Sequence, residues 1–474
     1  MFEKIQRSIK TILNLEYAKA GTCYVIANIL GQGVILLSAG IFTRMMGKEE
    51  YGLVSAYSTW VHVLNTFICL NLFITARNAY IDYKKDYDRY LSSILLLSLA
   101  AGAVTTVVVF IGSCLSGAGF GVEEIALACV HAISLNIINY ELAILSMKNQ
   151  YKKRAVMMIA PNWAHILASI LLMLIFSRNL YLAKISGNVL GLFIFAAGIT
   201  GMVFRKSFHR FIPEYWKYAL KISVPSIFNT LSDLLLMECD RLMLAAMIGA
   251  AETAEYSIVY NVGSIIVAIY QAINGAWLPW FYRRADKKDV ASVRKFQFWY
   301  LLGFTLFSCG MMAISPELIK IISPEGYWNG IRYVNLIIMA SYLIFLYAFF
   351  TSWLMFKKET GKIARNAIVA LVVNLLLNIA LIPEWKSFGA VITTVVSYSL
   401  LFILHYFSLG KAGKRYFSMK AIWKQLFYLA VGGYAFYLAR DKWYLRYGGY
   451  FAVVVIVIIQ YRKKIMTDFG IEKR

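Results

Sequence analysis

The sequence predicts an all-helical integral membrane protein that crosses the bilayer about fourteen times. Of its 474 residues, 60% are hydrophobic and only 15% are charged, which leaves too little polar surface to cover soluble domains of that size. The charges are also grouped, because apolar runs of about 20 residues alternate with short basic clusters from one end of the chain to the other. Both observations place the chain in lipid.

Fourteen apolar runs are long enough to be candidates for membrane-spanning helices. The first run carries no small-residue cleavage pattern, so we expect it to be a retained span and not a removable signal. The last two runs are the weakest. In chain order the runs cover residues 24–42, 53–76, 91–114, 125–146, 156–176, 182–204, 222–248, 257–281, 298–322, 333–356, 367–382, 390–409, 422–439 and 448–459.

The distribution of basic residues predicts the orientation of these spans. Lysine and arginine are enriched in short cytoplasmic loops, and 37 of the 48 basic residues fall on one side of the fourteen-span topology, together with both chain ends. An odd number of spans, or a missed span in the middle, would put successive basic loops on opposite sides and destroy this asymmetry. We therefore expect a multi-pass protein with both termini in the cytoplasm.

A weak internal repeat relates the two halves of the chain. Short motifs recur at offsets of 202 to 203 residues, as the pairs Gly47 and Gly249, Tyr57 and Tyr260, and Asn71 and Asn274. Because six spans return the chain to its starting side, the two six-helix lobes are parallel, with a pseudo-axis along the membrane normal. We expect an N-terminal lobe over residues 1–210, a C-terminal lobe over 211–410, and a helix pair with a cytoplasmic tail over 411–474.

Composition excludes several classes of ligand. The formal net charge of +23 does not indicate nucleic-acid binding, because the basic residues lie in loops between apolar spans and not on one soluble face. The six cysteines occur singly, with no CxxC motif and no histidine pairing at metal-ligand spacing. The sequence therefore predicts no nucleic acid, no metal and no cofactor.

Ionisable residues inside the spans are the first functional candidates, because charge in lipid is costly. The densest cluster lies in the seventh span, where Asp233 and Asp240 share a helix face and Glu238 and Arg241 can pair at i, i+3. We assign these acids, together with Glu141 in the fourth span, to ion coupling or to pairing between the lobes. A purely structural ion pair, and for Glu141 a bond to a neighbouring helix, are the alternatives.

Four further polar residues lie near the ends of spans. Arg44 ends the first span, Arg77 and Asn78 end the second, and Lys184 begins the sixth. Such side chains either line a substrate path or extend toward lipid head groups. Both interpretations remain open for Arg44, Arg77 and Lys184.

Two stretches of the sequence resemble a known family. Residues 41–57, IFTRMMGKEEYGLVSAY, are similar to the opening signature of bacterial polysaccharide repeat-unit (O-antigen or capsule) flippases, which belong to the multidrug, oligosaccharidyl-lipid and polysaccharide exporter superfamily. The stretches DRLML from Asp240 and EYSIVY from Glu255 resemble the seventh-to-eighth-span signature. The resemblance covers nearly the whole chain, although Ala254 and Glu255 stand where a glycine before tyrosine is commoner.

The resemblance implies a transporter without covalent chemistry, located in the bacterial cytoplasmic membrane. Its substrate would be an undecaprenyl-diphosphate-linked oligosaccharide, moved from the inner to the outer leaflet by alternating access for cell-surface polysaccharide export. A diphosphate needs partners that bind it bidentately, and the candidates are Arg44, Arg77 with Asn78, and Arg241. The implied partners are the lipid-linked oligosaccharide and membrane lipids, with a polysaccharide polymerase and glycosyltransferases as further candidates.

Three other functions remain open. A lipid II flippase for peptidoglycan precursors would use the same diphosphate group. A cation-coupled drug antiporter usually has twelve spans and binds cations through acids alone, whereas Glu238 and Asp240 here lie beside Arg241. A membrane polysaccharide polymerase or ligase normally needs a sizeable extracytoplasmic loop with catalytic residues, and the predicted loops on that side are short.

Overall fold

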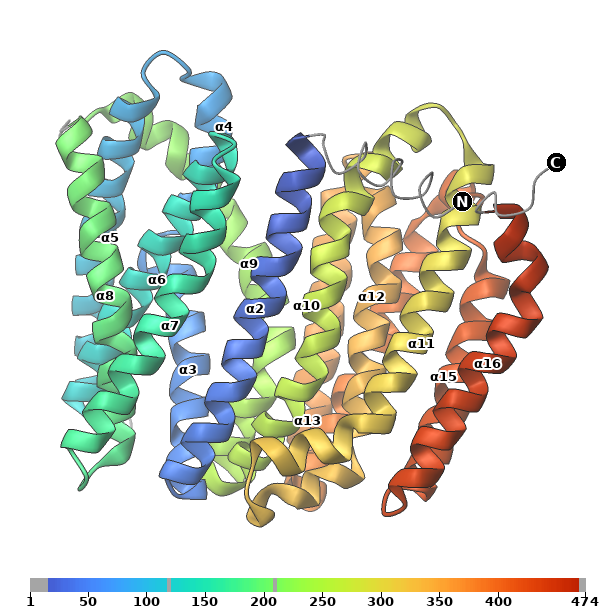
Figure 1. Cartoon of the computed structure of the whole chain (residues 1–474). Helices are drawn as coiled ribbons and strands as arrows, with labels where there is room; N and C mark the ends of the chain where they lie inside the picture. The colour runs from blue at the N-terminus through green and yellow to red at the C-terminus, as the bar shows by residue number, and fades with distance from the viewer. Residues whose placement is uncertain (1–15, 117–120, 208–210, 469–474) are drawn as a thin grey trace. The chain divides into compact units, whose positions relative to one another are not determined.

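The computed structural model describes residues 16–116, 121–207 and 211–468, and within these ranges it contains helices and no strand (Figure 1). The predicted all-α membrane fold class is therefore confirmed. The two chain ends, for which the sequence predicts a cytoplasmic location, fall outside the described ranges. The long helices are α2 (Glu16–Met45), α3 (Lys48–Ile68), α5 (Tyr87–Ser116), α6 (Val122–Met147), α7 (Tyr151–Ile175), α8 (Leu180–Lys206), α9 (Pro213–Met247), α10 (Ala250–Asp286), α11 (Val290–Ile322), α12 (Val334–Phe356), α13 (Thr360–Ser408), α15 (Met419–Leu438) and α16 (Trp443–Asp468).

Short helices connect some of these elements: η1 (Leu72–Ile74), α4 (Thr75–Asp82), η2 (Glu325–Arg332) and α14 (Gly410–Lys414). In the described part of the chain, nine helices are long and apolar enough to cross a membrane, or ten if α3 and the bent segment after it form one span. The helix α13 includes two predicted spans, residues 367–382 and 390–409. Between them the backbone leaves the helical conformation at Lys386, with φ 50° and ψ −133°. The number of fourteen crossings stays a prediction.

The second predicted span, residues 53–76, is broken where the prediction had one continuous helix. The helix α3 ends at Ile68, and the chain beyond it bends by 63°. Leu70 and Asn71 at the break have left-handed backbone angles, with φ of 51° and 54°. The amide of Asn71 donates hydrogen bonds to the hydroxyls of Ser226 and Thr230 on α9, at 3.0 and 3.1 Å. These long-range bonds hold the break in place.

Backbone contacts divide the chain into two compact units. Unit 1 consists of Met1–Ser257, Gln271–Ala276 and Ala367–Ala390, and unit 2 of Ile258–Tyr270, Trp277–Asn366 and Val391–Arg474. This grouping does not follow the predicted repeat. The predicted domain boundaries after residues 210 and 410 therefore stay a prediction.

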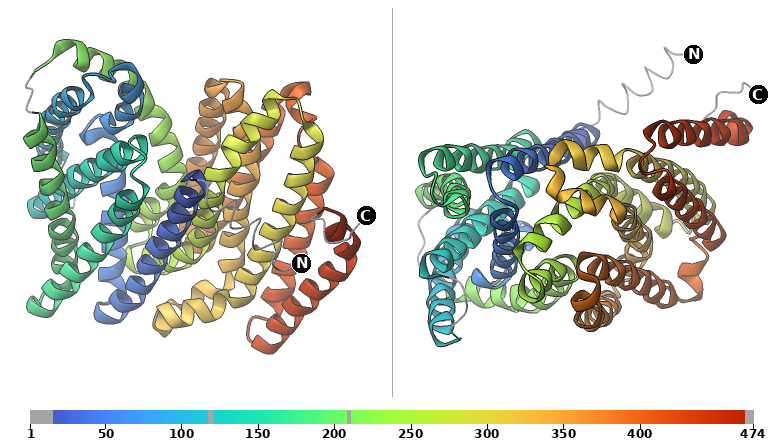
Figure 2. Two further views of the ribbon diagram at one scale, coloured as in Figure 1. Left: turned by 45° about the horizontal axis from the view of Figure 1, so that its top comes forward. Right: turned by 90° about the horizontal axis from the view of Figure 1, so that it is seen from below.

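Within unit 1, α7 and α8 run antiparallel and in close contact (Figures 1 and 2). A Cβ atom added to Gly187 would lie 2.3 Å from the Cα of Ser169, and one added to Gly191 would lie 2.3 Å from the Cα of His165. Small residues allow such close approach between helices in membranes. The helix α6 packs on α8 and α3, and α2 packs on α7.

Lys184 is buried inside this bundle, with 5% of its surface exposed. Its ammonium donates to the Oδ1 of Asn188 at 2.7 Å and lies 3.7 Å from the ring centroid of Phe42. Its ammonium therefore does not extend toward lipid head groups, because polar side chains of α7 and α8 meet it inside the bundle. A place on the substrate path stays a prediction.

Unit 2 contains the predicted C-terminal helix pair, α15 and α16, and both helices pack against α11 (Figure 1). Arg446 on α16 is buried, and its guanidinium donates to the Glu317 carboxylate and the Ala313 carbonyl of α11. The amide of Asn335 on α12 donates to the Gly433 carbonyl of α15 at 3.1 Å. A buried arginine needs such partners, so these bonds fix the pair to unit 2.

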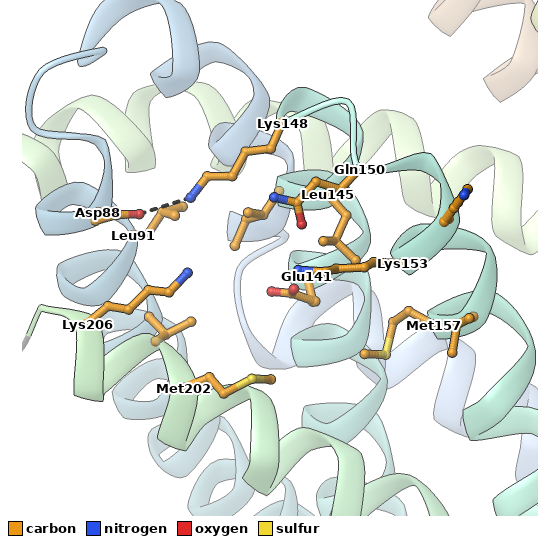
Figure 3. A pocket seen from close by; sticks show the side chains of 14 residues that line it. Asp88, Leu91, Glu141, Leu145, Lys148, Gln150, Lys153, Met157, Met202 and Lys206 are labelled. Atoms are coloured by element: carbon orange, nitrogen blue, oxygen red, sulfur yellow. Dashed lines mark hydrogen bonds and ion pairs between the residues drawn. The ribbon is translucent and has the colours of Figure 1, made fainter. Parts of the chain in front are cut away.

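A pocket of about 560 Å³ lies in unit 1, between α5, α6, α7 and α8 (Figure 3). Both signs of charge line it, together with apolar side chains. The charged lining residues are Asp88, Glu141, Lys148, Lys152, Lys153 and Lys206.

Candidate functional site

The repeat predicted from the sequence places two helix starts at corresponding positions. Gly47 is the N-cap residue of α3, and Gly249 directly precedes α10. Gly249 has a φ of 130°, a conformation that residues with a Cβ atom rarely adopt. The two glycines of the repeat therefore mark the turns that lead into α3 and α10.

These two helices touch each other near their first turns. The hydroxyl oxygens of Ser55 on α3 and Ser257 on α10 are 2.5 Å apart, and their separation of 202 residues is the offset of the repeat. If the predicted repeat holds, these two serines are equivalent residues, and equivalent residues that contact each other are expected next to a pseudo-symmetry axis. A Cβ atom on Gly52 would lie 1.7 Å from the carbonyl oxygen of Ala250, so the two backbones are in direct contact.

An ion pair joins the same two helices. The ammonium of Lys48 lies 3.0 Å from the Oε2 of Glu255, whose side chain is 4% exposed. Glu255 is one of the two residues at which the sequence departs from the family signature, and the structure gives it a partner. We call the set that joins the two helices the α3–α10 contact: Lys48, Gly52, Ser55, Ala250, Glu255 and Ser257.

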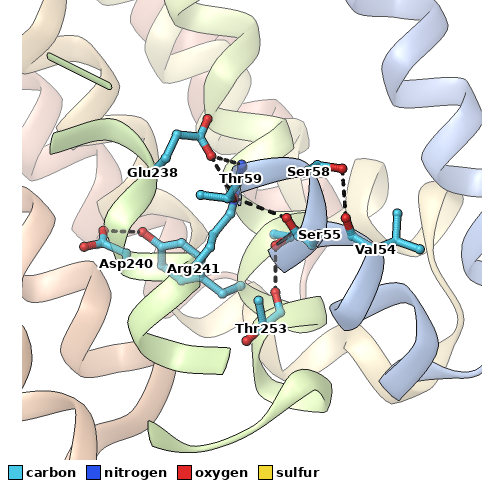
Figure 4. A network of polar contacts seen from close by, with 10 residues as sticks. Val54, Ser55, Ser58, Thr59, Glu238, Asp240, Arg241 and Thr253 are labelled. Carbon is cyan, nitrogen blue, oxygen red and sulfur yellow. Dashed lines mark hydrogen bonds and ion pairs between the residues drawn. The ribbon is translucent and has the colours of Figure 1, made fainter. Parts of the chain in front are cut away.

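A second network begins on α9, next to this contact (Figure 4). Arg241 donates to the Oε2 of Glu238 at 2.6 Å, and both side chains are 13% exposed. Thr59 on α3 also donates to the Oε2 of Glu238, at 3.2 Å. The i, i+3 pair proposed from the sequence is thus present, and it links α9 to α3.

Asp240 is almost fully buried, and its carboxylate is held by side chains from two other helices. It accepts hydrogen bonds from the amide of Asn378 on α13 at 2.6 Å and from the hydroxyl of Tyr256 on α10 at 2.7 Å. Asn378 also donates to the Oδ1 of Asn374 at 3.1 Å. A buried carboxylate is tolerated only with such donors, so Asp240 ties α9, α10 and α13 together.

No group of three or more histidine, cysteine or acidic side chains in the described ranges is arranged to hold a metal ion. The carboxylate of Asp240 and the amide oxygen of Asn374 are the kind of oxygen donors that hard cations take. Ion coupling through Asp240 accordingly stays a hypothesis, and so does the structural alternative.

The other residues singled out from the sequence lie elsewhere. Arg44, Arg77, Asn78 and Asp233 are exposed, and the guanidinium of Arg44 donates to the carbonyl of Gly40 in its own helix at 2.7 Å. Glu141 is not part of the α9 network and lines the pocket between α5 and α8 instead. Of the eight predicted site residues, the structure thus brings together Glu238, Asp240 and Arg241.

Several residues of this region were missed in the sequence. Asn374 and Asn378 occupy positions i and i+4 of an apolar span, a spacing that puts both on one helix face and could have identified them. Lys48 and Glu255 carried no such signal, because each lies at the end of a span, where charge is common. Their pairing appears only when α3 and α10 meet.

Comparisons with known proteins agree with this fold. The family model described as "Polysaccharide biosynthesis protein" matches residues 18–284, which is more than half of the chain. No curated protein sequence matches.

Solved structures extend the likeness to nearly the whole chain. A structure described as "Lipid II flippase MurJ, inward closed conformation" has a TM-score of 0.70 at 14% identity and covers 94% of this chain and 99% of its own. An inward-facing multidrug resistance MATE family transporter of the MOP superfamily has a TM-score of 0.58 at 14% identity, covering 81% and 96%. A structure of the MATE multidrug transporter DinF-BH gives 0.58 at 15%, covering 86% and 97%. The described chain therefore has the fold of these transporters.

Proposed function

Because the chain belongs to the polysaccharide biosynthesis protein family, we propose that it is a flippase for the lipid-linked precursors of a cell-surface polysaccharide. It moves undecaprenyl-diphosphate-linked oligosaccharide repeat units from the inner to the outer leaflet of a bacterial cytoplasmic membrane by alternating access. The observation that carries the proposal is the family match over residues 18–284, on a chain with a membrane-transporter fold.

In this proposal the diphosphate is bound by arginine. Arg44 and Arg77 are exposed, so a ligand can reach them, and Asn78 adds an amide beside Arg77. Arg241 pairs with Glu238 and its side chain is 13% exposed, so in this proposal the diphosphate competes with Glu238 for the guanidinium. A guanidinium fork matches two phosphate oxygens at once. Carrying about two negative charges out of a negative interior also gains roughly 2.3 kcal/mol per charge per 100 mV.

The α3–α10 contact supplies the part that must move. On the predicted topology the loops before α3 and α10 are extracytoplasmic, so the contact lies at the outer end of both helices. A transporter that alternates between its two sides must break one closure to release its cargo. We assign this role to the α3–α10 contact.

A lipid II flippase is the second candidate, and the likeness to the MurJ structure over 94% of the chain favours it. Its substrate shares the diphosphate, so the same arginines serve either cargo. The two candidates differ in the head group that the diphosphate carries.

The test uses the full chain reconstituted into vesicles with a fluorescent undecaprenyl-diphosphate-linked oligosaccharide. A membrane-impermeant glycan-modifying enzyme outside the vesicles measures how much probe has crossed. We expect transport by the wild-type chain, with slower or no transport of lipid II. Faster transport of lipid II selects the second candidate, and no transport of either lipid contradicts the function.

Arg241→Ala tests the binding site in the same assay. We expect it to abolish transport at normal expression, because the diphosphate loses a bidentate partner. Arg178→Ala, which removes an exposed arginine outside the site, serves as the matched control. Since Arg241→Ala also removes the ion-pair partner of Glu238 and leaves it only the Thr59 hydroxyl among the contacts described above, the double variant Glu238→Gln/Arg241→Gln is measured as well. Normal transport by either Arg241 variant contradicts a role for this residue in binding.

A further inference from the structure

The pocket between α5, α6, α7 and α8 is not used by the proposed transport cycle. Its four lysines and two acids leave a formal charge of +2. The proposed flippase function requires neither the pocket nor its charge, so the pocket calls for a separate explanation.

Most of its positive charge is available to a ligand. Lys148 lies 3.1 Å from the carboxylate of Asp88 at the rim. Lys153 and Lys206, on α7 and α8, are exposed, and within the described ranges no ion pair or hydrogen bond joins either to another residue. Figure 3 shows Lys206 extending from α8 into the space in front of Glu141. An anion placed there would be approached by lysines from two helices.

A separate apolar groove lies further along three of the same helices, α5, α6 and α8. It has a volume of about 390 Å³ and is lined by residues of α5, α6 and α8. Ile137 in the groove precedes Ile144 in the pocket by seven residues, and Ala196 precedes Val203 by seven. Residues seven apart share a helix face, so one face of α6 and one face of α8 line both spaces. Seven residues correspond to about 10 Å along a helix.

The groove presents little polar surface to a ligand. Two of its lining residues carry hydroxyl groups, and both hydroxyls bond within their own helices. Ser134 donates to the carbonyl of Val130 at 2.8 Å, and Thr200 donates to the carbonyl of Ala196 at 2.8 Å. A hydrocarbon chain fits such a lining, whereas a polar ligand does not.

We propose that pocket and groove together bind one anionic glycerophospholipid. Its phosphate sits among Lys148, Lys153 and Lys206, and one acyl chain follows the groove between α6 and α8. Two observations favour a membrane lipid over a soluble anion: the apolar groove behind the charges, and the exposed apolar side chains of Val156 (62%) and Met202 (53%) at the mouth. Basic pockets between helices on the cytoplasmic side are known sites for anionic head groups, and the predicted topology places these lysines on that side.

The site has a consequence for the stability of the protein. A ligand that binds only the folded state raises its unfolding temperature, and the rise grows with the logarithm of the ligand concentration above the dissociation constant. The bound phosphate also offsets repulsion between lysines on neighbouring helices. We therefore expect anionic lipid, and not zwitterionic lipid, to stabilise the purified full chain.

The test measures binding of dioleoyl-phosphatidylglycerol to the full chain in neutral detergent, by native mass spectrometry and by the unfolding temperature. Dioleoyl-phosphatidylcholine is the zwitterionic comparison. We expect Lys153→Gln/Lys206→Gln to weaken phosphatidylglycerol binding about 30-fold, which corresponds to about 1 kcal/mol per lysine. The matched control is Lys217→Gln/Lys221→Gln, which removes two exposed lysines of α9 and should change binding less than twofold.

A second variant tests the groove. Ala197→Trp places a large side chain in the acyl path and should weaken binding of the dioleoyl lipid without affecting its dihexanoyl analogue. Unfolding temperatures measured without lipid show whether each variant is folded.

Four results would overturn the proposal. The first is an equal loss of phosphatidylglycerol binding in both lysine double variants, and the second is phosphatidylcholine binding as tight as phosphatidylglycerol binding. The third is competition by inorganic phosphate as strong as that by the lipid, and the fourth is displacement of phosphatidylglycerol by a lower concentration of undecaprenyl diphosphate. The first two remove specificity for the anionic head group. The third indicates a soluble anion, and the fourth indicates a substrate site.

Discussion

The α3–α10 contact allows a direct test of alternating access, because its two serines can be replaced by a disulfide. The Oγ atoms of Ser55 and Ser257 are 2.5 Å apart, only about half an ångström more than the 2.05 Å length of an S–S bond. The variant is Ser55→Cys/Ser257→Cys, made together with Cys114→Ser because Cys114 is the exposed cysteine among the described residues.

The size of the effect follows from what holds the native contact. The hydroxyl pair contributes about 1 kcal/mol, and the charged hydrogen bond between Lys48 and Glu255 about 1.5–3 kcal/mol. If the closed state is more stable than the open state by a few kcal/mol, the open state is populated at about 0.1–10%. The transport cycle can pass through a state with this population. A disulfide abolishes that population. Transport should therefore fall in direct proportion to the cross-linked fraction.

The assay is the vesicle transport measurement, run on oxidised protein and again after reduction with dithiothreitol. Reduction should restore the rate, and neither single cysteine variant should respond to oxidant. Transport at the wild-type rate by fully cross-linked protein would refute the reasoning, since the α3–α10 contact could then stay closed throughout the cycle.

Two further predictions concern stability. Gly52→Ala puts a Cβ atom 1.7 Å from a carbonyl oxygen of α10, so we expect the unfolding temperature of this variant to fall by several degrees. The control Gly198→Ala adds a Cβ atom with nothing within 4 Å and should not lower the unfolding temperature. Equal falls in both variants would disprove the close approach of α3 and α10. Asp240→Ala removes the acceptor of the hydrogen bonds from Asn378 and Tyr256. It should lower the free energy of unfolding by about 1–3 kcal/mol for each of these lost hydrogen bonds, measured by denaturant unfolding. An unchanged unfolding midpoint would contradict the network.

The fold class and the positions of the helices follow from local sequence. In lipid each backbone N–H and C=O must be satisfied inside its own segment, so an apolar run of about 20 residues becomes a helix whatever its neighbours are. The predicted apolar runs accordingly coincide with the helices of the structure. The break after Ile68 is the exception, because it depends on bonds from Asn71 to residues of α9 that are 155 and 159 positions away.

The candidate site was predictable only in part. Glu238, Asp240 and Arg241 stand out in the sequence because charge inside an apolar run is rare, and the pairing of Glu238 with Arg241 follows from helix geometry. The donors to Asp240 lie on other helices, and one of them, Asn378, is 138 residues away. The spacing of residues within one helix does not predict a contact between residues so far apart in the sequence.

The same division holds for the lysines of the pocket. The sequence by itself determined that Lys148, Lys153 and Lys206 lie at the ends of apolar runs, because burying charge in lipid is costly. Only the tertiary structure decided that they surround one pocket with Glu141, with an apolar groove behind it. Packing between helices depends on residues from different apolar runs. An example is the close approach of α7 and α8 at Gly187 and Gly191, which neither run specifies alone.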